Sequence, residues 1–527
     1  MTKGRVYLVG AGPGDPKLIT VKGLEALQKS DCVVYDRLAG PQLLNRARPD
    51  AELIYVGKLT DRHTMKQEDI NRLLVDLALQ GKTVTRLKGG DPTVFGRVGE
   101  EAELLGQHGI PYEIIPGITS AIAVPAYAGI PVTHRDLASS FSVITGHESP
   151  DKLDRSIQWD KVTHATGTLV FLMGVAKIGY IAEQLIKHGR SPETPVALIR
   201  WGTRAEQRTL TGTLADIEER VKEANFQPPA VIVVGEVVRQ RETLAWIEDK
   251  PLFGLRVLVT RSRSQASELA DKIYELGGEP YEFPVIETRL PDSAEAVERV
   301  RHALADAESY DWVLLTSVNG VDYFFRWLDH FGVDIRRFHK ARFAAVGPKT
   351  GEALAARGVR SELLPEKYRA EGLLESLSGP IKAGQKALLP RGDLARVILP
   401  RELERLGVEP VVIDTYVTVP AEKKDPFLLE MLQNGEIHVV TFTSSSTVVN
   451  FVDALKHSGV EDPARLLSGV EIACIGPITA RTAEEQGLTV TALAEPSTID
   501  GLVTALSNKR LHQERRTDGH GLPSYKA

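Results

Sequence analysis

The amino-acid sequence predicts an α/β protein with mostly parallel sheets, divided into more than one domain. Apolar, strand-like runs such as RVYLVG (5–10) and WVLLTS (312–317) alternate with helical patterns along the whole chain, which is typical of βαβ units. The chain has 527 residues, of which 42% are hydrophobic and 25% charged. This composition is ordinary for a globular protein, but the chain is longer than one hydrophobic core usually organises. We therefore expect several α/β domains.

Charge and cysteine content exclude several classes of protein. The formal net charge of −6 argues against a dedicated nucleic-acid binder, whose domains are strongly basic. Cys32 and Cys474, the only cysteines, lie in opposite halves of the chain, which excludes a disulfide framework. The N-terminus carries no apolar segment typical of a signal peptide, and no apolar run is long enough to cross a membrane. We expect a cytoplasmic protein without a nucleic-acid or membrane partner.

Strand-like runs follow one another in each half of the chain. Those of the first half are RVYLVG, DCVVYD, TVTRLKG, YEIIP, TLVFLMG, PVALIR and AVIVVGEVV, and those of the second are RVLVTR, WVLLTS, RFAAVG, KALLPR, VVIDTY, VVTFTS and EIACIG. Between the two series, WIEDKPLFG (246–254) contains Pro251 and Gly254, which interrupt regular structure. The predicted organisation is a first region over 1–247 with lobes at about 1–115 and 116–247, a linker over 248–253, a second region over 254–507, and a polar tail over 508–527.

The second half contains a weak internal repeat. AAVGPKTGEALAARGV (344–359) is similar to ACIGPITARTAEEQGL (473–488), and WVLLTSVNGVDYF (312–324) is similar to VVTFTSSSTVVNF (439–451). The repeat predicts two related lobes with a ligand cleft between them. Lobe A comprises 254–283 plus 420–507, and lobe B comprises 289–411. We expect EFPVIET (282–288) and VVIDTYVTV (411–419) to form a two-stranded hinge.

The first glycine loop, GAGPGD (10–15), follows a strand and precedes a helix. Glycines there let the backbone approach a ligand, although a tight structural turn is an equally good interpretation. A dinucleotide fingerprint requires a third glycine where Asp15 stands, and Pro13 removes one amide from the loop. Asp36 nevertheless closes the next strand, where such a fold carries a ribose-binding acid. An NAD-dependent enzyme therefore stays an alternative.

Polar residues and glycines also follow later strands of the first half, where α/β folds bind ligands. They are Lys88, Gly89, Gly90, Asp91, Arg97, Thr119, Ser120, His134 and Arg135. Taken singly, Thr119 is a helix cap, and His134 and Arg135 are a surface pair. Their joint order along the chain favours a binding site.

That order resembles a known enzyme family. The blocks GAGPGD, VYDRL, VGK, RLKGGDPTVFGR, PGITSA, GIPVTHR, TGH, FLMG and PAVIVVGEVV resemble, in sequence and order, those of the uroporphyrinogen-III C-methyltransferases of sirohaem and corrinoid synthesis. The resemblance covers nearly all of residues 3–247. It implies two methylations of uroporphyrinogen III, at C2 and C7, that use S-adenosylmethionine and give precorrin-2.

The resemblance also assigns residues. The residues it implies for binding S-adenosylmethionine are Pro13, Gly89, Gly90, Asp91, Val94, Thr119, Ser120, Met173 and Gly202. The family's proton acceptor falls on Asp36 and its proton donor on Lys58. Val98 and Trp201 depart from the family pattern, in which a glycine and a smaller polar residue are usual, so the pocket can differ in shape. The family is typically dimeric, which implies a homodimer formed through this half.

Uroporphyrinogen III carries eight carboxylates, so basic side chains near the motifs are candidate partners for it. These are Arg37, Lys58, Arg62, His63, Arg97, His134 and Arg135. Solvated surface charge is the alternative interpretation for each of them. We favour the pocket for Arg97 and Arg135, which flank the glycine motifs.

The second half places hydroxyl groups at strand ends. In order, TSVN, VGPKT, PRGD, TYVT, TSSS and IGPITA resemble the sparse motifs of uroporphyrinogen-III synthase, with Thr415 where a valine is usual. The resemblance implies cyclisation of hydroxymethylbilane to uroporphyrinogen III with inversion of ring D. It makes Tyr416 the candidate to assist loss of water, with Thr350 and Thr479 holding substrate from opposing lobes. Ser317 and Ser444 would lie near the substrate carboxylates.

Two hypotheses compete with this bifunctional enzyme. One is the NAD-dependent oxidoreductase built on the first glycine loop. The other treats residues 254–507 as a tetrapyrrole-sensing module without synthase activity that regulates the methyltransferase. Neither half shows a metal-ligand pattern, so S-adenosylmethionine is the expected cofactor, no metal is expected, and the partners are small tetrapyrroles.

Overall fold

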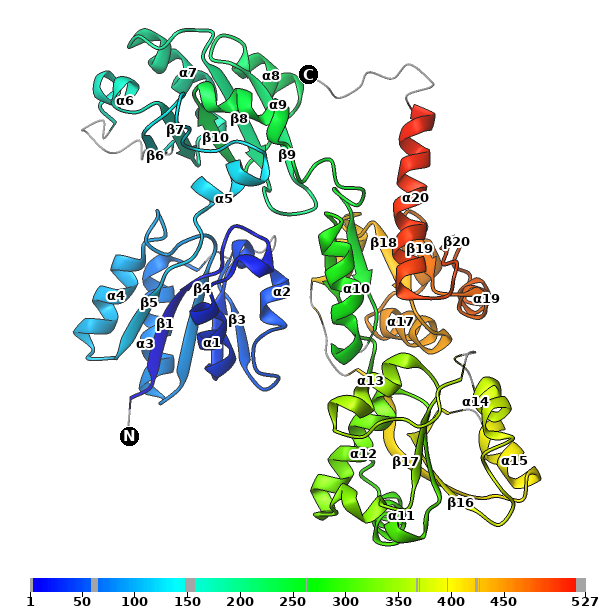
Figure 1. Ribbon diagram of the computed structural model, residues 1–527. Helices are drawn as coiled ribbons and strands as arrows, with labels where there is room; N and C mark the ends of the chain where they lie inside the picture. Colours follow the sequence, from blue (N-terminus) through cyan, green and yellow to red (C-terminus); the bar gives the residue numbers. More distant parts are fainter. Residues whose placement is uncertain are drawn as a thin grey trace. The chain divides into compact units, whose positions relative to one another are not determined.

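The computed structural model describes residues 3–57, 65–146, 157–261, 263–365, 368, 370–395, 397–421, 425 and 427–517. These residues form four five-stranded sheets packed against helices, which confirms the predicted α/β class. The chain divides into two compact units (Figure 1). Unit 1 contains residues 1–260, 265–283 and 425–527, and unit 2 contains residues 261–264 and 284–424. The first three sheets belong to unit 1 and the fourth to unit 2.

The first sheet is wholly parallel, with strand order β3-β2-β4-β1-β5. Its elements are β1 (Arg5–Gly10), η1 (Pro16–Leu18), α1 (Val21–Lys29), β2 (Cys32–Tyr35), η2 (Arg37–Ala39), α2 (Pro41–Leu44), β3 (Glu52–Tyr55), α3 (Gln67–Leu79), β4 (Thr83–Lys88), α4 (Val98–Gln107) and β5 (Tyr112–Ile115). Helices α3 and α4 pack on one face, and α1 and α2 on the other. Successive apolar residues of each strand point to opposite faces of the sheet and pack in two different cores. Leu8 faces α3 and α4, whereas Val9 faces α1.

The second sheet, with order β6-β7-β10-β8-β9, is mixed rather than parallel. Only β6 and β7 run parallel among its paired strands, and β10 is antiparallel to both of its neighbours. Its elements are α5 (Ser120–Tyr127), β6 (Phe141–Thr145), α6 (Trp159–Ala165), β7 (Thr168–Leu172), η3 (Val175–Lys177), α7 (Ile178–Lys187), β8 (Pro195–Arg200), β9 (Arg208–Thr213), α8 (Ile217–Glu223), β10 (Ala230–Val234), η4 (Glu236–Gln240) and α9 (Arg241–Leu244). Helix α5 covers one face, and α6, α7 and α8 cover the other.

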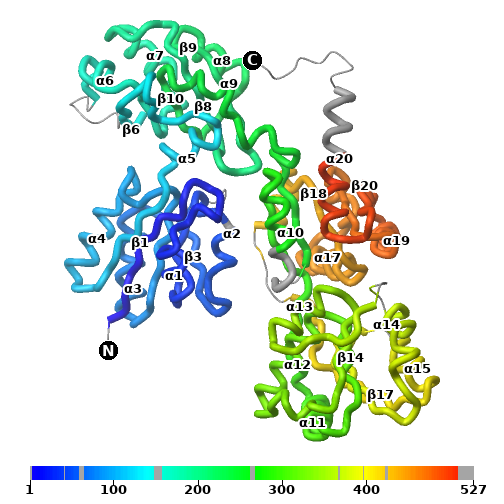
Figure 2. The backbone as a smooth tube through the Cα atoms, viewed as in Figure 1, coloured from blue at the N-terminus to red at the C-terminus, as the bar shows by residue number. Residues whose placement is uncertain are grey.

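The third sheet is parallel, with order β12-β11-β18-β19-β20, and joins two distant stretches of sequence. Strand β11, from the first stretch, pairs with β18, from the second, and Figure 2 shows green and orange parts of the chain in the same sheet. Its elements are β11 (Arg256–Val259), α10 (Arg263–Glu275), β12 (Glu279–Glu282), α16 (Leu428–Gln433), β18 (Val439–Phe442), α17 (Ser445–His457), α18 (Pro463–Leu466), β19 (Glu471–Cys474), α19 (Pro477–Glu485), β20 (Val490–Leu493) and α20 (Ile499–Thr517). Residues of α10 and α20 share one core with the strands.

Unit 2 holds the fourth sheet, with order β13-β17-β16-β14-β15. Its elements are β13 (Ile286–Arg289), α11 (Ala294–Ala305), η5 (Ala307–Ser309), β14 (Trp312–Leu315), α12 (Val318–Phe331), η6 (Ile335–Phe338), β15 (Arg342–Ala345), α13 (Pro348–Ala356), α14 (Ala370–Leu377), β16 (Lys386–Gly392), α15 (Ile398–Arg405) and β17 (Glu409–Pro420). Strands β13 and β17, at the two ends of this unit, pair antiparallel from Ile286↔Pro420 to Arg289↔Val417. The two segments predicted to form a hinge are therefore paired.

The helices and side chains of the described residues bear on membrane association and metal binding. Among the described residues, no helix combines the length and apolar character that a membrane span needs. Within the same residues, no group of three or more His, Cys, Asp or Glu side chains is placed to hold a metal ion. Cys32 and Cys474 are both buried and free.

Candidate functional site

In the first sheet, the predicted site residues lie at the carboxyl ends of the parallel strands. The GAGPGD loop follows β1, Asp36 follows β2, the GGDP segment follows β4, and Thr119 and Ser120 follow β5. Ligands of open parallel sheets bind at this edge. Since β4 lies between β2 and β1, its loop is flanked by both of the others.

Glycines let these loops meet at their backbones. Gly12 and Gly90 form an antiparallel bridge, in which the Gly90 amide donates to the Gly12 carbonyl over 2.7 Å. A Cβ at Gly10 would lie 2.5 Å from the Cα of Gly117, and one at Gly117 would lie 2.3 Å from the Gly90 oxygen. No side chain larger than hydrogen fits at these positions, so the glycines fix the loops of β1, β4 and β5 against one another.

The Asp91 carboxylate ties two of the loops together. Its Oδ1 accepts hydrogen bonds from the amide (2.7 Å) and hydroxyl (2.5 Å) of Thr93, and its Oδ2 accepts one from the Gly117 amide (2.9 Å). Asp91 is 8% exposed. Both oxygens of Asp91 therefore help to hold the loop, and its predicted contact with S-adenosylmethionine stays a prediction.

The β4 loop lies directly against the start of α5. A Cβ at Gly90, whose φ is +69°, would make ordinary van der Waals contact there, 3.8 Å from the Ser120 amide nitrogen and 3.9 Å from the Thr119 Cα. Thr119 caps α5 by accepting a hydrogen bond from the Ala121 amide. The sequence prediction that Thr119 and Ser120 lie beside Gly89 and Gly90 agrees with this geometry.

The second lobe contributes the β8–β9 loop. A Cβ at Gly202 would lie 2.4 Å from Cγ1 of Val124 in α5, so the loop packs directly on that helix. The next residue, Thr203, accepts a hydrogen bond through Oγ1 from the Asp15 amide over 3.0 Å. Met173, Trp201 and Thr203 all have positive φ values, of 59°, 47° and 73°. Non-glycine residues in this region are strained, and such residues cluster at functional loops.

Asp36 is paired with a buried arginine. Its Oδ1 caps η2 by accepting from the Leu38 amide (3.1 Å), and its Oδ2 lies 3.0 Å from Nη2 of Arg86. The Arg86 side chain is 5% exposed and that of Asp36 is 26% exposed. The carboxylate therefore stays accessible at the strand edge while its counter-ion lies inside the fold.

Arg86 belongs to a buried charge cluster that the sequence analysis did not identify as part of the site. Glu101, in α4, has no exposed side-chain surface, and its Oε1 accepts from Nζ of Lys88 (2.6 Å) and Nε of Arg86 (3.5 Å). Burial lowers the pKa of Lys88, and the Glu101 charge opposes that shift. The sequence did contain a signal for this cluster, because Arg86 and Lys88 lie two residues apart in β4 and therefore on the same face of the strand.

The remaining predicted residues of the first half are less closely linked to this edge. Arg97 forms an exposed ion pair with Glu100 (2.7 Å). His134 accepts a hydrogen bond from the Asp136 amide within its own loop (3.2 Å), and Arg135 is exposed. Lys58, Arg62 and His63 lie outside the described residues.

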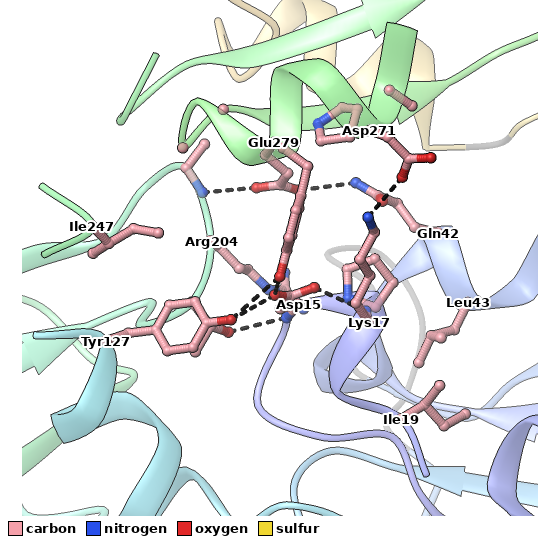
Figure 3. A pocket seen from close by; sticks show the side chains of 18 of the residues that line it. Asp15, Lys17, Ile19, Gln42, Leu43, Tyr127, Arg204, Ile247, Asp271 and Glu279 are labelled. Carbon is pink, nitrogen blue, oxygen red and sulfur yellow. Dashed lines mark hydrogen bonds and ion pairs between the residues drawn. The ribbon is translucent and has the colours of Figure 1, made fainter. Parts of the chain in front are cut away.

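A cavity of about 540 Å³ opens behind the first glycine loop, within unit 1 (Figure 3). It is lined by Asp15, Tyr127, Arg204, Tyr274 and Glu279 among others. None of the predicted cofactor residues lines it. This cavity is therefore distinct from the strand-edge site.

In unit 2, Tyr416 on β17 lies beside Ser317. Their hydroxyl oxygens are 3.4 Å apart, and the Tyr416 ring stacks on Tyr323 with 5.1 Å between centroids. A Cβ at Gly392 would lie 2.5 Å from the Tyr416 ring, so glycine is required there. Burial raises the pKa of Tyr416. A cavity of about 300 Å³ at the ends of β14 and β16, lined in part by Thr316 and Arg391, opens in the same unit.

The internal repeat places the other predicted hydroxyls at equivalent positions. Ser317 caps α12 and Ser444 caps α17, each accepting from an amide of the first turn. Thr350 and Thr479 are buried at the third positions of α13 and α19, after matching Gly-Pro pairs. Ser317 and Thr350 lie in unit 2, and Ser444 and Thr479 lie in unit 1. Exposed amides at such helix starts attract carboxylates.

Comparison with known proteins covers both halves. Residues 5–218 match the tetrapyrrole (corrin/porphyrin) methylases, and residues 267–504 match the uroporphyrinogen-III synthase HemD family. A porphyrin biosynthesis protein HemD from Ruminiclostridium josui is 38% identical over 507 residues, 96% of this chain and 98% of that protein.

Two relatives match mainly the first half. A uroporphyrinogen-III C-methyltransferase from Bacillus subtilis is 47% identical over 68% of this chain and 72% of its own length. One from Priestia megaterium is 58% identical over 45% of this chain and 98% of its own length. The two resemblances drawn from sequence motifs are thereby confirmed: the chain belongs to the family of tetrapyrrole-biosynthesis fusion proteins in which a uroporphyrinogen-III C-methyltransferase precedes a uroporphyrinogen-III synthase.

Proposed function

We propose that residues 254–507 cyclise hydroxymethylbilane to uroporphyrinogen III with inversion of ring D, and that residues 1–247 methylate this product at C2 and C7 to give precorrin-2. The observation that carries the proposal is the convergence of four strand-end loops on one edge of the first sheet, in a chain with this family membership. The product of the second half is the substrate of the first, which accounts for their fusion.

The strand-edge loops suit S-adenosylmethionine, which supplies an electrophilic methyl group when bound. The residues that would hold it are Pro13, Gly89, Gly90, Asp91, Val94, Thr119, Ser120, Met173 and Gly202. Support comes from the way Gly90, in the loop after β4, lies next to Thr119 and Ser120 at the start of α5. Asp91 also fixes the loop through Thr93 and Gly117, and its Oδ2, which accepts one hydrogen bond there, has a second lone pair for the methyl donor.

Asp36 would act as the proton acceptor of the methylation. Its carboxylate is partly exposed at the strand edge, and the adjacent Arg86 guanidinium holds it in position there. Lys58 would be the proton donor. Arg97, His134 and Arg135 would bind substrate carboxylates, for which Arg97 must exchange its exposed partner Glu100.

Tyr416 would assist loss of the hydroxyl group of hydroxymethylbilane as water. Its raised pKa keeps the phenol protonated, so it is a hydrogen-bond donor at neutral pH. Ser317 and Thr350 from one lobe, and Ser444 and Thr479 from the other, would bind the substrate. We further propose that the protein acts in the cytoplasm as a homodimer formed through residues 1–247.

The proposal is tested by a coupled assay that starts from hydroxymethylbilane and S-adenosylmethionine with a labelled methyl group. The expected product is a doubly labelled precorrin-2. Formation of the type I isomer alone would refute the synthase assignment, because that isomer arises without an enzyme. Uroporphyrinogen III that accumulates without label would refute the methyltransferase assignment.

A further inference from the structure

Asp15, the last residue of the first glycine loop, is held by groups from three parts of unit 1. Its side chain is nearly inaccessible, with the residue 3% exposed. Oδ1 accepts from the Lys17 amide (2.8 Å), and Oδ2 accepts from the hydroxyl of Tyr127 (2.7 Å) and from that of Tyr274. Its own amide donates to Thr203. A buried carboxylate with several donors is strongly fixed in position.

Tyr274 differs from the other partners of Asp15 because it belongs to the synthase sequence. It lies on α10, whereas Tyr127 and Thr203 lie in the methyltransferase sequence. Burial and the hydrogen bond to Asp15 raise the pKa of Tyr274 to about 12, so its hydroxyl remains a donor through neutral pH. The Lys17 ammonium lies 4.2 Å from the centre of the Tyr274 ring and 2.7 Å from the Asp271 carboxylate of the same helix.

A second contact between the same parts of unit 1 surrounds Glu279 on β12 (Figure 3). Its carboxylate accepts from Nε2 of Gln42 (3.1 Å) and from the Ala205 amide (2.7 Å), which belong to the two methyltransferase lobes. Arg256, 2% exposed, donates to both Glu279 oxygens over 3.0 Å. Fully paired buried charges of this kind break only at considerable cost, so α10 and β12 form a fixed support beside the glycine loop.

The loop between these supports is short. Gly12 is bridged to Gly90, and Asp15 is clamped by Tyr127 and Tyr274, so only Pro13 and Gly14 lie between two fixed points. Pro13 is the loop residue assigned to the methyl donor. Any shift of Asp15 must therefore change the backbone at Pro13.

We propose that Tyr274 is a positioning residue of the methyltransferase: through Asp15, the synthase sequence sets the conformation of the loop that binds the methyl donor. This inference rests on the proposed function of residues 1–247. Helix α10 belongs to the synthase sequence, and the inference gives it an additional role in methyl transfer. By thermodynamic reciprocity, donor binding also stabilises the contact between Asp15 and α10.

The test compares Tyr274→Phe with Tyr310→Phe in the full chain. Tyr310 is a matched control, because its buried hydroxyl donates to the Ala303 carbonyl within unit 2 (3.0 Å). Calorimetric titration with S-adenosylhomocysteine should show about tenfold weaker binding for Tyr274→Phe, as expected for loss of a hydrogen bond to a charged group. The KM for S-adenosylmethionine should rise with the KM for uroporphyrinogen III unchanged, and Tyr310→Phe should match the wild type.

Two results would overturn the inference. One is a Tyr274→Phe affinity equal to that of the wild type, and the other is an equal loss in both variants, which would indicate general destabilisation. A wild-type protein that does not bind S-adenosylhomocysteine would refute the proposed function instead. Hydrogen exchange on the unaltered chain gives an independent measurement: S-adenosylhomocysteine should slow exchange in α10 but not in α12, and unchanged exchange in α10 would contradict the proposal.

Discussion

Nη2 of Arg86 lies 3.0 Å from Oδ2 of Asp36, and the pair links two neighbouring strands of the first sheet. Asp36 directly follows β2, whereas Arg86 lies within β4. The arginine is almost wholly buried and the aspartate is not. The ion pair therefore sets the orientation of a carboxylate at the strand-edge site.

Replacing Asp36 with asparagine should impair methyl transfer without impairing donor binding. The amide keeps the size and the cap of η2 but does not accept a proton, so the rate should fall about 10²- to 10⁴-fold. Label transfer to uroporphyrinogen III and calorimetry with S-adenosylhomocysteine measure the two effects. Asp76→Asn, an exposed position on α3, serves as the control. Methylation by Asp36→Asn at the wild-type rate would exclude Asp36 as the proton acceptor.

The Lys88–Glu101 pair should contribute to stability mainly when both partners are present. Lys88→Met leaves a buried carboxylate with one cation fewer and should lower the free energy of unfolding by about 3–5 kcal/mol. The double variant Lys88→Met/Glu101→Leu should recover part of that loss, since no unpaired carboxylate remains. Urea unfolding measures the series. Lys222→Met removes an exposed ion pair with Glu218 and should change stability by less than about 1 kcal/mol.

Gly202 should tolerate alanine only if Val124 becomes smaller. The added Cβ would lie 2.4 Å from a Val124 methyl group, and such overpacking costs about 1–3 kcal/mol. Gly202→Ala should therefore lower stability and weaken binding of S-adenosylhomocysteine. Gly202→Ala/Val124→Ala should restore part of both, because it removes the two methyl groups but leaves the Cβ of residue 124 at 2.9 Å. Gly99→Ala is the control, because open space surrounds that position in α4. If Gly202→Ala alone binds as the wild type does, the loop does not depend on this contact.

Tyr416→Phe should slow formation of uroporphyrinogen III about 10²-fold, since it removes a proton donor, and should leave methyl transfer intact. Burial raises the pKa of Tyr416 above the ordinary value of 10.0. Any alkaline fall in synthase activity due to Tyr416 should therefore be centred above pH 10. Chromatographic analysis of the uroporphyrinogen isomers across the pH range measures both the rate and its pH dependence. A fall in synthase activity that is centred below pH 10 in the wild type and absent in Tyr416→Phe would contradict the raised pKa.

The sequence alone was sufficient to predict the elements whose signals are local. The glycine loops at 10–15 and 89–91 follow apolar strands, so their place at one sheet edge could be predicted from the alternation of strands and helices. The paired hinge segments and the equivalent places of Thr350 and Thr479 followed from the internal repeat. Family membership followed from many ordered motifs rather than from any single one.

Features that depend on long-range packing could not be predicted in this way. Local spacing does not give strand direction, so the antiparallel place of β10 between β7 and β8 was missed. The sequence also did not indicate that Arg97 pairs with Glu100, and its role in binding substrate stays a prediction. Glu101 and Tyr274 interact with residues distant in sequence, and their roles become visible only when the chain is folded.

Unit 2 interrupts the third sheet in the sequence, and this has a consequence for biosynthesis. Strands β11 and β12 leave the ribosome early, but their partners β18, β19 and β20 are translated only after the whole of unit 2. Unit 2 is nearly continuous in sequence and can fold as soon as it emerges. The edge of β11 that pairs with β18 stays unpaired meanwhile, so the nascent chain exposes a strand edge throughout the synthesis of unit 2, when assistance by chaperones would matter most.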